Sequence, residues 1–239
     1  MTEMVRRLLR QKFGSVLVMI GLAVLSALTA VQAALGGEAA LESSGFLTLL
    51  LLGAASVSRD VSNGALQMIL ARPILRVEYL FGRYCGILLA YAICLAMTGA
   101  LTLVFSPLLR GLLGSARPLS LPGLARGAAG ALLSAALFAS ILLFFSTFLP
   151  GYGDVLAYFL LSLLIGLPEI LAGPLGIPSL SKIGPALREN VLPRVAWGEV
   201  LRGEGVFSGQ VSAYVLAVTA YLALAALIFS HREFSYGRD

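Results

Sequence analysis

Long apolar runs with few charged residues alternate with shorter polar segments along this chain. A transmembrane helix requires about 20 mostly apolar residues. Six runs approach or exceed this length: 13–35, 40–58, 84–106, 124–149, 154–172 and 211–230. The pattern therefore predicts an all-α membrane protein with six transmembrane helices in a single domain of 239 residues.

Three polar segments outside these runs are predicted to form smaller elements. Residues 1–12 place apolar residues and arginines at helical spacing, which favours an amphipathic helix on the membrane surface, or else a plain basic flank. Residues 59–83 form an insert between the second and third spans. Residues 173–210 contain several prolines and predict short external helices, with Trp197 at the membrane interface, or a compact external cap.

The composition supports lipid as the solvent of this chain. It is 59% hydrophobic and 12% charged, with a mean hydropathy of +0.93, whereas soluble domains carry about 25% charged residues. The net charge of +5 comes from arginines in the loops and does not indicate a nucleic-acid partner.

The distribution of basic residues predicts the orientation of the chain. Arginines concentrate in the N-terminal segment, in the insert and at the C-terminus, while the first outer loop, 36–45, carries only acidic charges. The positive-inside rule then places both termini in the cytoplasm. A cleaved signal peptide, ending near Val31-Gln32-Ala33, is the alternative for the N-terminus.

The sequence contains no recognisable catalytic, cofactor-binding or metal-binding motif. The lysines, Lys12 and Lys182, do not stand in a P-loop, and the single His231 excludes a His-Glu-x-x-His site. Cys85 and Cys94 share one apolar run and predict packing residues. An enzyme is therefore not expected.

Glu169 is a carboxylate within an outer apolar stretch. Ionisable residues inside a membrane span often serve function, so Glu169 is a possible intramembrane functional residue. The alternative is a hydrated, interfacial carboxylate at a break of the fifth span after Pro168.

The insert has the pattern of a short surface helix. Residues suited to a helix N-cap come first, and an apolar face follows over residues 66–70. The helix is expected to end at Arg72-Pro73, because the residue before a proline disfavours the α conformation. The N-cap types are Asp60, Ser62 and Asn63.

The insert and its flanks also carry a longer sequence signature. It consists of Ser58-Arg59-Asp60, Ser62-Asn63-Gly64-Ala65-Leu66-Gln67, Leu70-Ala71-Arg72-Pro73-Ile74, Arg76, Glu78-Tyr79 and Gly82-Arg83-Tyr84. This signature resembles that of ABC-2-type permeases, the membrane subunits of ABC transporters with the type V exporter fold. Asp60 stands where many members of that family have glutamate. The six-span layout matches over the whole length, but less specifically.

The resemblance implies a permease subunit of an ATP-driven transporter, an exporter in the bacterial cytoplasmic (inner) membrane. It implies a second permease copy, surrounding lipid and two copies of an ABC ATP-binding subunit that hold ATP and magnesium, so no cofactor is expected on this chain. The insert would be the coupling helix that contacts this subunit. The residues that would make the contact are Asp60, Ser62, Asn63, Gly64, Leu66, Gln67, Leu70, Arg72 and Pro73.

Two other functions remain open at this stage. An ATP-independent carrier would need ionisable residues within the membrane, for which only Glu169 qualifies. A non-transporting scaffold would need no such residue. The resemblance covers lipids, lipid-linked glycans, drugs, peptides and, in one branch of the family, species for metal-cofactor assembly. The apolar stretch 138–148 favours amphiphiles among them.

Overall fold

The computed structural model describes residues 5–6, 10, 12–14, 16–36, 46–58, 60, 75–113, 120–175, 178–203 and 209–231. Every regular element in these ranges is a helix. The long helices are α2 (Val16–Gly36), α7 (Arg76–Leu113), α8 (Leu121–Ser146), α9 (Gly153–Leu175) and α12 (Gly209–His231). The shorter ones are α4 (Phe46–Gly53), α10 (Pro178–Val191) and α11 (Trp197–Val200).

Five of the described helices are long and apolar enough to cross a membrane. The candidate crossing segments, by length and hydropathy, are Val18–Leu35, Arg76–Leu108, Leu121–Ser146, Gly153–Leu171 and Gly209–His231. The described residues confirm the predicted all-helical fold, and these five helices indicate a multi-pass membrane protein; they do not establish the predicted six spans. Of the predicted second span, 40–58, the structure describes residues 46–58, which hold α4 and a following turn at 54–57, and the eight-residue α4 is not among the helices long enough to cross. Residues 40–45 and most of residues 1–12 lie outside the described residues.

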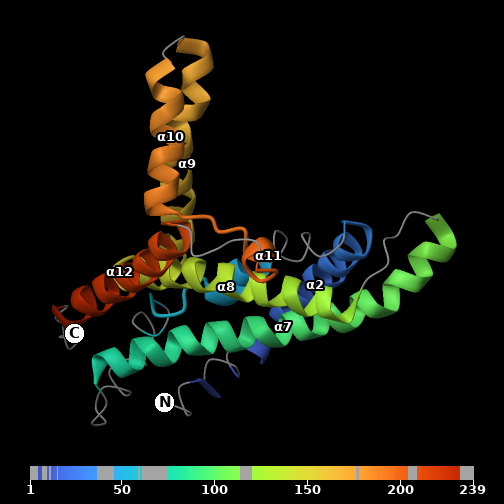
Figure 1. The fold of residues 1–239 in the computed structure, drawn as a ribbon. Coiled ribbons are helices and arrows are strands. Elements are labelled where there is room, and N and C mark those ends of the chain that lie inside the picture. Colours follow the sequence, from blue (N-terminus) through green and yellow to red (C-terminus); the bar gives the residue numbers. More distant parts are fainter. Residues whose placement is uncertain are drawn as a thin grey trace.

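The long helices form a layer from which one hairpin stands away. Helices α7 and α8 lie side by side, α2 packs against α7, and α12 packs against α8 (Figure 1). Helices α9 and α10 pack on each other and rise out of this layer. The N-terminal half of α7 and the C-terminal ends of α8 and α12 therefore lie at one end of the layer.

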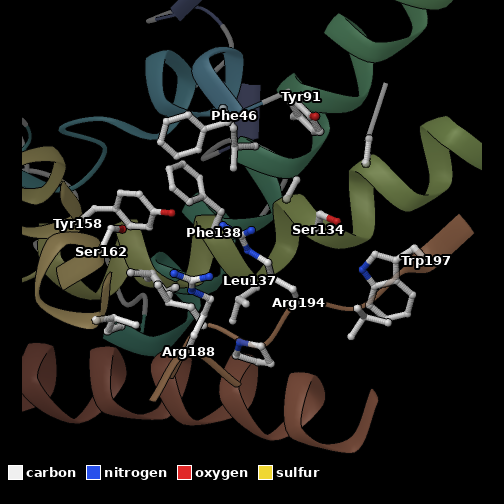
Figure 2. A pocket seen from close by; sticks show the side chains of 18 residues that line it. Phe46, Tyr91, Ser134, Leu137, Phe138, Tyr158, Ser162, Arg188, Arg194 and Trp197 are labelled. Carbon is white, nitrogen blue, oxygen red and sulfur yellow. The ribbon is translucent and has the colours of Figure 1, made fainter. Parts of the chain in front are cut away.

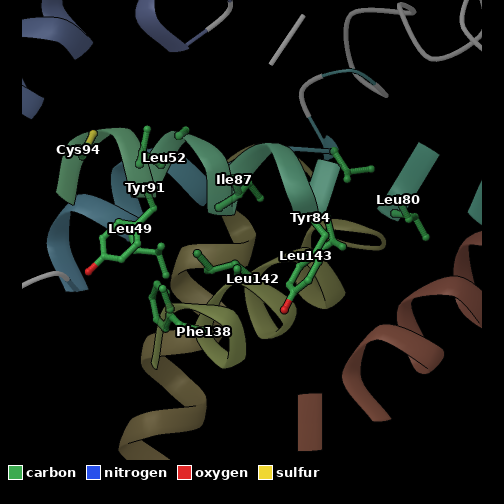
Figure 3. Close-up of a cluster of buried hydrophobic side chains, with 14 of the residues drawn as sticks. Leu49, Leu52, Leu80, Tyr84, Ile87, Tyr91, Cys94, Phe138, Leu142 and Leu143 are labelled. Atoms are coloured by element: carbon green, nitrogen blue, oxygen red, sulfur yellow. The ribbon is translucent and has the colours of Figure 1, made fainter. Parts of the chain in front are cut away.

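The main core lies where α4, α7 and α8 meet (Figure 3). Leu52, Ile87 and Leu142 are fully buried there, and Tyr91 and Phe138 close the cluster. Lipid tails are as apolar as leucine, so burial alone contributes little to association of helices in a membrane. Close packing and hydrogen bonds between helices must hold the layer together.

Tyrosines supply several of these bonds. The Tyr84 hydroxyl of α7 donates to the Ala136 carbonyl of α8 at 3.2 Å, and the Tyr214 hydroxyl of α12 donates to the Leu133 carbonyl. In membranes such bonds contribute about 0.6 kcal/mol each on average. They fix the rotation of α7 and α12 about the shared neighbour α8.

Three details differ from the sequence expectations. Helix α7 begins at Arg76, not at residue 84, and α9 continues through the predicted break at Pro168. Trp197 does not sit at an exposed interface: it is 6% exposed and packs edge-on against Tyr214, with ring centroids 4.9 Å apart. The indole thereby fills the space between α8 and α12.

Candidate functional site

Because α7 begins at Arg76, the insert from here on means residues 61–74, and polar side chains connect the helix ends on both sides of it. We call this set the insert-flanking network and define it by the residues that follow. Its members come from the N-terminal segment, from the turn after α4, and from α7, α8 and α9: Lys12, Ala55, Ser58, Asp60, Arg76, Tyr79, Arg83, Ser146 and Asp154.

The turn after α4 is held by a buried carboxylate of α9. Ala55 has a φ of +53°, in the left-handed region that costs a residue with a side chain energy. Asp154 is fully buried, and its Oδ2 accepts a hydrogen bond from the Ala55 N–H at 2.7 Å. Its Oδ1 accepts from the Val155 N–H at 2.9 Å in the first turn of α9. One carboxylate thus stabilises both the strained turn and a helix N-terminus.

The end of α8 holds the next residues of the turn. The Ser146 Oγ accepts hydrogen bonds from the N–H groups of Val57 and Ser58, both at 3.1 Å. The Ser58 hydroxyl donates to the Gly151 carbonyl at 2.6 Å. Gly151 has a φ of +61°, which glycine adopts without strain in the turn between α8 and α9.

Two basic residues bind carbonyl groups at helix C-termini. Lys12 Nζ donates to the carbonyls of Ala54 at 2.9 Å and Leu51 at 3.5 Å, at the end of α4. Arg76 donates to the Ser230 carbonyl at 2.8 Å, at the end of α12. Cations are favoured at these positions because the last carbonyls of a helix lack backbone partners and carry partial negative charge.

A buried ion pair joins the beginning of the insert to α7. Asp60 and Arg83 form a direct salt bridge, and their side chains are 9% and 4% exposed. The Tyr79 hydroxyl donates to Asp60 Oδ2 at 2.8 Å and accepts from Arg83 Nε at 3.3 Å. The Tyr79 ring stacks on Phe229 of α12, with centroids 5.7 Å apart. A buried charge without its partner would cost several kcal/mol, so the two charges depend on each other.

This geometry attaches both ends of the insert to the membrane helices. Asp60 is the last described residue before the segment 61–74, and α7 begins at Arg76, one residue beyond Leu75. The ion pair, Ser146 and Asp154 hold the first end, while Arg76 and Tyr79 hold the second end against α12. The described residues on both sides of segment 61–74 are therefore bonded to the membrane helices.

The expected contact residues have different outcomes. Asp60 is buried, and its carboxylate is paired with Arg83 and Tyr79; its contact with an ATP-binding subunit stays a prediction. The other expected contact residues lie outside the described residues: Ser62, Asn63, Gly64, Leu66, Gln67, Leu70, Arg72 and Pro73.

Sequence reasoning missed the contacts that Arg83, Asp154 and Ser146 make. Arg83 lies in the third turn of α7, next to a long uncharged stretch, and Asp154 lies in the first turn of α9; a charge at the edge of an apolar run was the available signal for both. Ser146 gave no signal, because a serine at the end of an apolar helix is unremarkable in sequence.

Glu169 is paired at the surface of the α9–α10 hairpin. Its Oε2 accepts a hydrogen bond from Arg188 Nη2 at 2.8 Å, and the side chains of Glu169 and Arg188 are 49% and 37% exposed. An exposed pair of this kind contributes about 0–1 kcal/mol. Glu169 thus helps hold α10 on α9. Within the described ranges, no three His, Cys, Asp or Glu residues gather as a metal site would require.

The helices and their polar ends define a multi-pass helical membrane protein. No protein-family model matches the chain, and no curated protein matches its sequence.

Proposed function

We propose that this chain is the permease subunit of an ATP-driven transporter of the ABC-2 type. The support is the combination of the insert signature with the insert-flanking network. Asp60, Tyr79 and Arg83 belong to the signature, and they come together in one buried cluster. A segment whose ends are bonded to several helices suits the transmission of force from a partner.

In this proposal a separate ATP-binding subunit contacts residues 61–74. A ligand-driven change requires contacts that differ between two states, and ATP-driven closure of the partner would supply that difference. The rigid attachment of Asp60 to Arg83 then carries the motion into α7, and the bonds of Ser146 and Asp154 carry it into α8 and α9.

The proposed assembly contains two permease copies and two ATP-binding subunits in a bacterial cytoplasmic membrane. ATP and Mg²⁺ belong to the ATP-binding subunits. The direction of transport is export, and both termini of the permease face the cytoplasm.

The first test is purification of the tagged protein from native membranes in mild detergent, followed by mass spectrometry and an ATPase assay. A P-loop ATPase is expected in stoichiometric amount with the unaltered protein. Leu66→Glu places a charge on the apolar face of the insert and is expected to abolish this association.

Leu201→Glu is the matched control, because Leu201 is an exposed leucine after α11, far in sequence from the insert. This variant is expected to retain the ATPase. A well-folded, unaltered protein that brings no ATPase would contradict the proposal and favour an ATP-independent carrier or a scaffold. If both variants lost the ATPase equally, the result would contradict the proposal that the ATP-binding subunit contacts the insert.

A further inference from the structure

A cavity of about 540 Å³ opens between α4, α7, α8, α9 and the segment that follows α10 (Figure 2). It is separate from the insert-flanking network. Phe46 lies at the opposite end of α4 from the turn at 54–57, and Tyr91 lies about 12 Å beyond Arg83 along α7, at 1.5 Å per residue. A volume of this size is typical of sites for small molecules.

Aromatic rings form one wall of the cavity. Phe138 of α8 packs edge-on against Phe46 and Tyr158, with ring centroids 4.8 Å and 4.5 Å apart. Such edge-to-face contacts stabilise the rings in fixed orientations. The wall is therefore preformed, and it presents an apolar surface suited to a hydrocarbon chain.

Two arginines enter the cavity from the segment after α9. Arg188 and Arg194 direct their guanidinium groups into the space beside Leu137 and Phe138 (Figure 2). Arg188 shares its charge with Glu169 on the outer side, whereas Arg194 has no ion-pair partner among the described residues. Two arginines and one carboxylate leave one net positive charge at this end of the cavity.

The aromatic wall alone would suit a purely apolar ligand, whereas the two arginines require a ligand that also carries an anionic group. Guanidinium groups bind phosphate oxygens through paired hydrogen bonds. The hydroxyl groups of Ser134 and Ser162 lie on the lining and add further hydrogen-bonding capacity. A ligand that satisfies every part of the lining has an apolar chain and one anionic phosphate group.

We propose that this cavity binds an anionic phospholipid, with its chain along the aromatic wall and its phosphate between Arg188 and Arg194. Free phosphate would leave the aromatic wall uncovered, and a zwitterionic lipid would bring a second, cationic group to the arginines. The binding of this lipid is independent of the proposed function. Only the idea that the lipid is the transported substrate rests on it.

The test is photolabelling of the purified full-length chain, without any ATP-binding subunit, in lipid nanodiscs. Phosphatidylglycerol and phosphatidylcholine each carry the same diazirine on one acyl chain. Labelled peptides are mapped by mass spectrometry. We expect phosphatidylglycerol to label residues 131–141 and 158–165 roughly fivefold more than phosphatidylcholine, a ratio equivalent to about 1 kcal/mol.

Arg194→Gln is expected to remove this preference while leaving the labelling of the exposed face of α12 unchanged. Arg202→Gln, the same substitution at an exposed arginine outside the cavity, is expected to retain the preference. Ser134→Phe narrows the cavity and is expected to reduce labelling by both lipids there.

Equal labelling by the two lipids, or a preference that survives Arg194→Gln, would overturn the proposal. Suppression of the phosphatidylglycerol label by millimolar inorganic phosphate would also overturn it, since phosphate alone would then be the ligand. Because the ATP-binding subunit is absent from this experiment, its result is independent of the test of the permease proposal.

Discussion

At the scale of single residues, Asp60 and Arg83 lose their contact with water on burial. Their salt bridge and their hydrogen bonds with the Tyr79 hydroxyl replace that contact. Removing two charges from water costs about as much as their attraction returns, so a buried pair is not a strong source of net stability. The pair instead constrains the structure, because moving the two side chains apart would leave each buried charge without its partner. The pair therefore fixes the path of the chain before the insert.

This reasoning predicts strongly coupled substitutions. Arg83→Gln or Asp60→Asn alone leaves one buried charge unpaired and is expected to reduce the free energy of unfolding by about 3–5 kcal/mol. The double variant is expected to lose much less than the sum, because no orphan charge remains. Unfolding by denaturant in detergent micelles measures all three values.

Additive losses in that cycle would show that the two side chains do not interact in the folded protein. Arg83→Lys serves as a control for charge alone. It keeps the cation but lacks the guanidinium that contacts Tyr79 through Nε, and an intermediate loss is expected.

At the scale of elements, the α9–α10 hairpin depends on close contact of two backbones. A Cβ atom at Gly184 of α10 would lie 3.1 Å from Glu169 Cβ and 3.3 Å from the Glu169 backbone nitrogen of α9. Neither atom belongs to the free end of a flexible side chain. The hairpin must widen to admit any larger residue here.

Gly184→Val is therefore expected to destabilise the hairpin. Valine has a higher helix propensity than glycine, by a few tenths of a kcal/mol, which alone would stabilise α10. Overpacking costs about 1–3 kcal/mol, so the net effect on the stability of the hairpin is unfavourable. Hydrogen exchange of residues 182–191 should become faster. Ala186→Val, at an exposed position of the same helix, is the control and should change exchange little; equal effects of both variants would refute the close contact.

The long helices were predictable because a membrane imposes a minimum length on apolar segments. The start of α7 was not, since Arg83 is indistinguishable from a loop residue until its partner Asp60 is known. The burial of Trp197 was also hidden, because it depends on the position of Tyr214 in α12.

The candidate site was predictable only in part. The signature pointed to Asp60 and to the insert, but not to the residues that hold them. Ser146 and Asp154 act on residues 88 to 99 positions earlier in the chain, and no local pattern encodes contacts at such separation.

At the scale of the whole molecule, the number of crossings decides where the termini lie. Six crossings place both termini on one side, whereas the five long helices alone would place them on opposite sides. The short helix α4 is the element in question. It packs against α2, α7 and α8, and its residues Leu49 and Leu52 are buried among them, but its eight residues are fewer than a crossing requires.

Single cysteines test the six-crossing layout. In a Cys85→Ala, Cys94→Ala background, Arg6→Cys and His231→Cys are expected to react with a membrane-impermeant maleimide only after permeabilisation of spheroplasts. Ala186→Cys, in the external segment, should react in intact spheroplasts. Reaction of Arg6→Cys and His231→Cys from opposite sides would establish an odd number of crossings.

The turn after α4 is synthesised well before the residues that hold it in place. Ala55 leaves the ribosome 99 residues before Asp154, the side chain that accepts its N–H. At about 5–20 residues per second, this gap lasts roughly 5–20 seconds. For most of that interval the nascent turn lacks both Asp154 and Ser146. The hydrogen bonds that hold this turn therefore form only after the second half of the chain has been synthesised, and a truncated product that stops before α9 lacks the bond to Asp154.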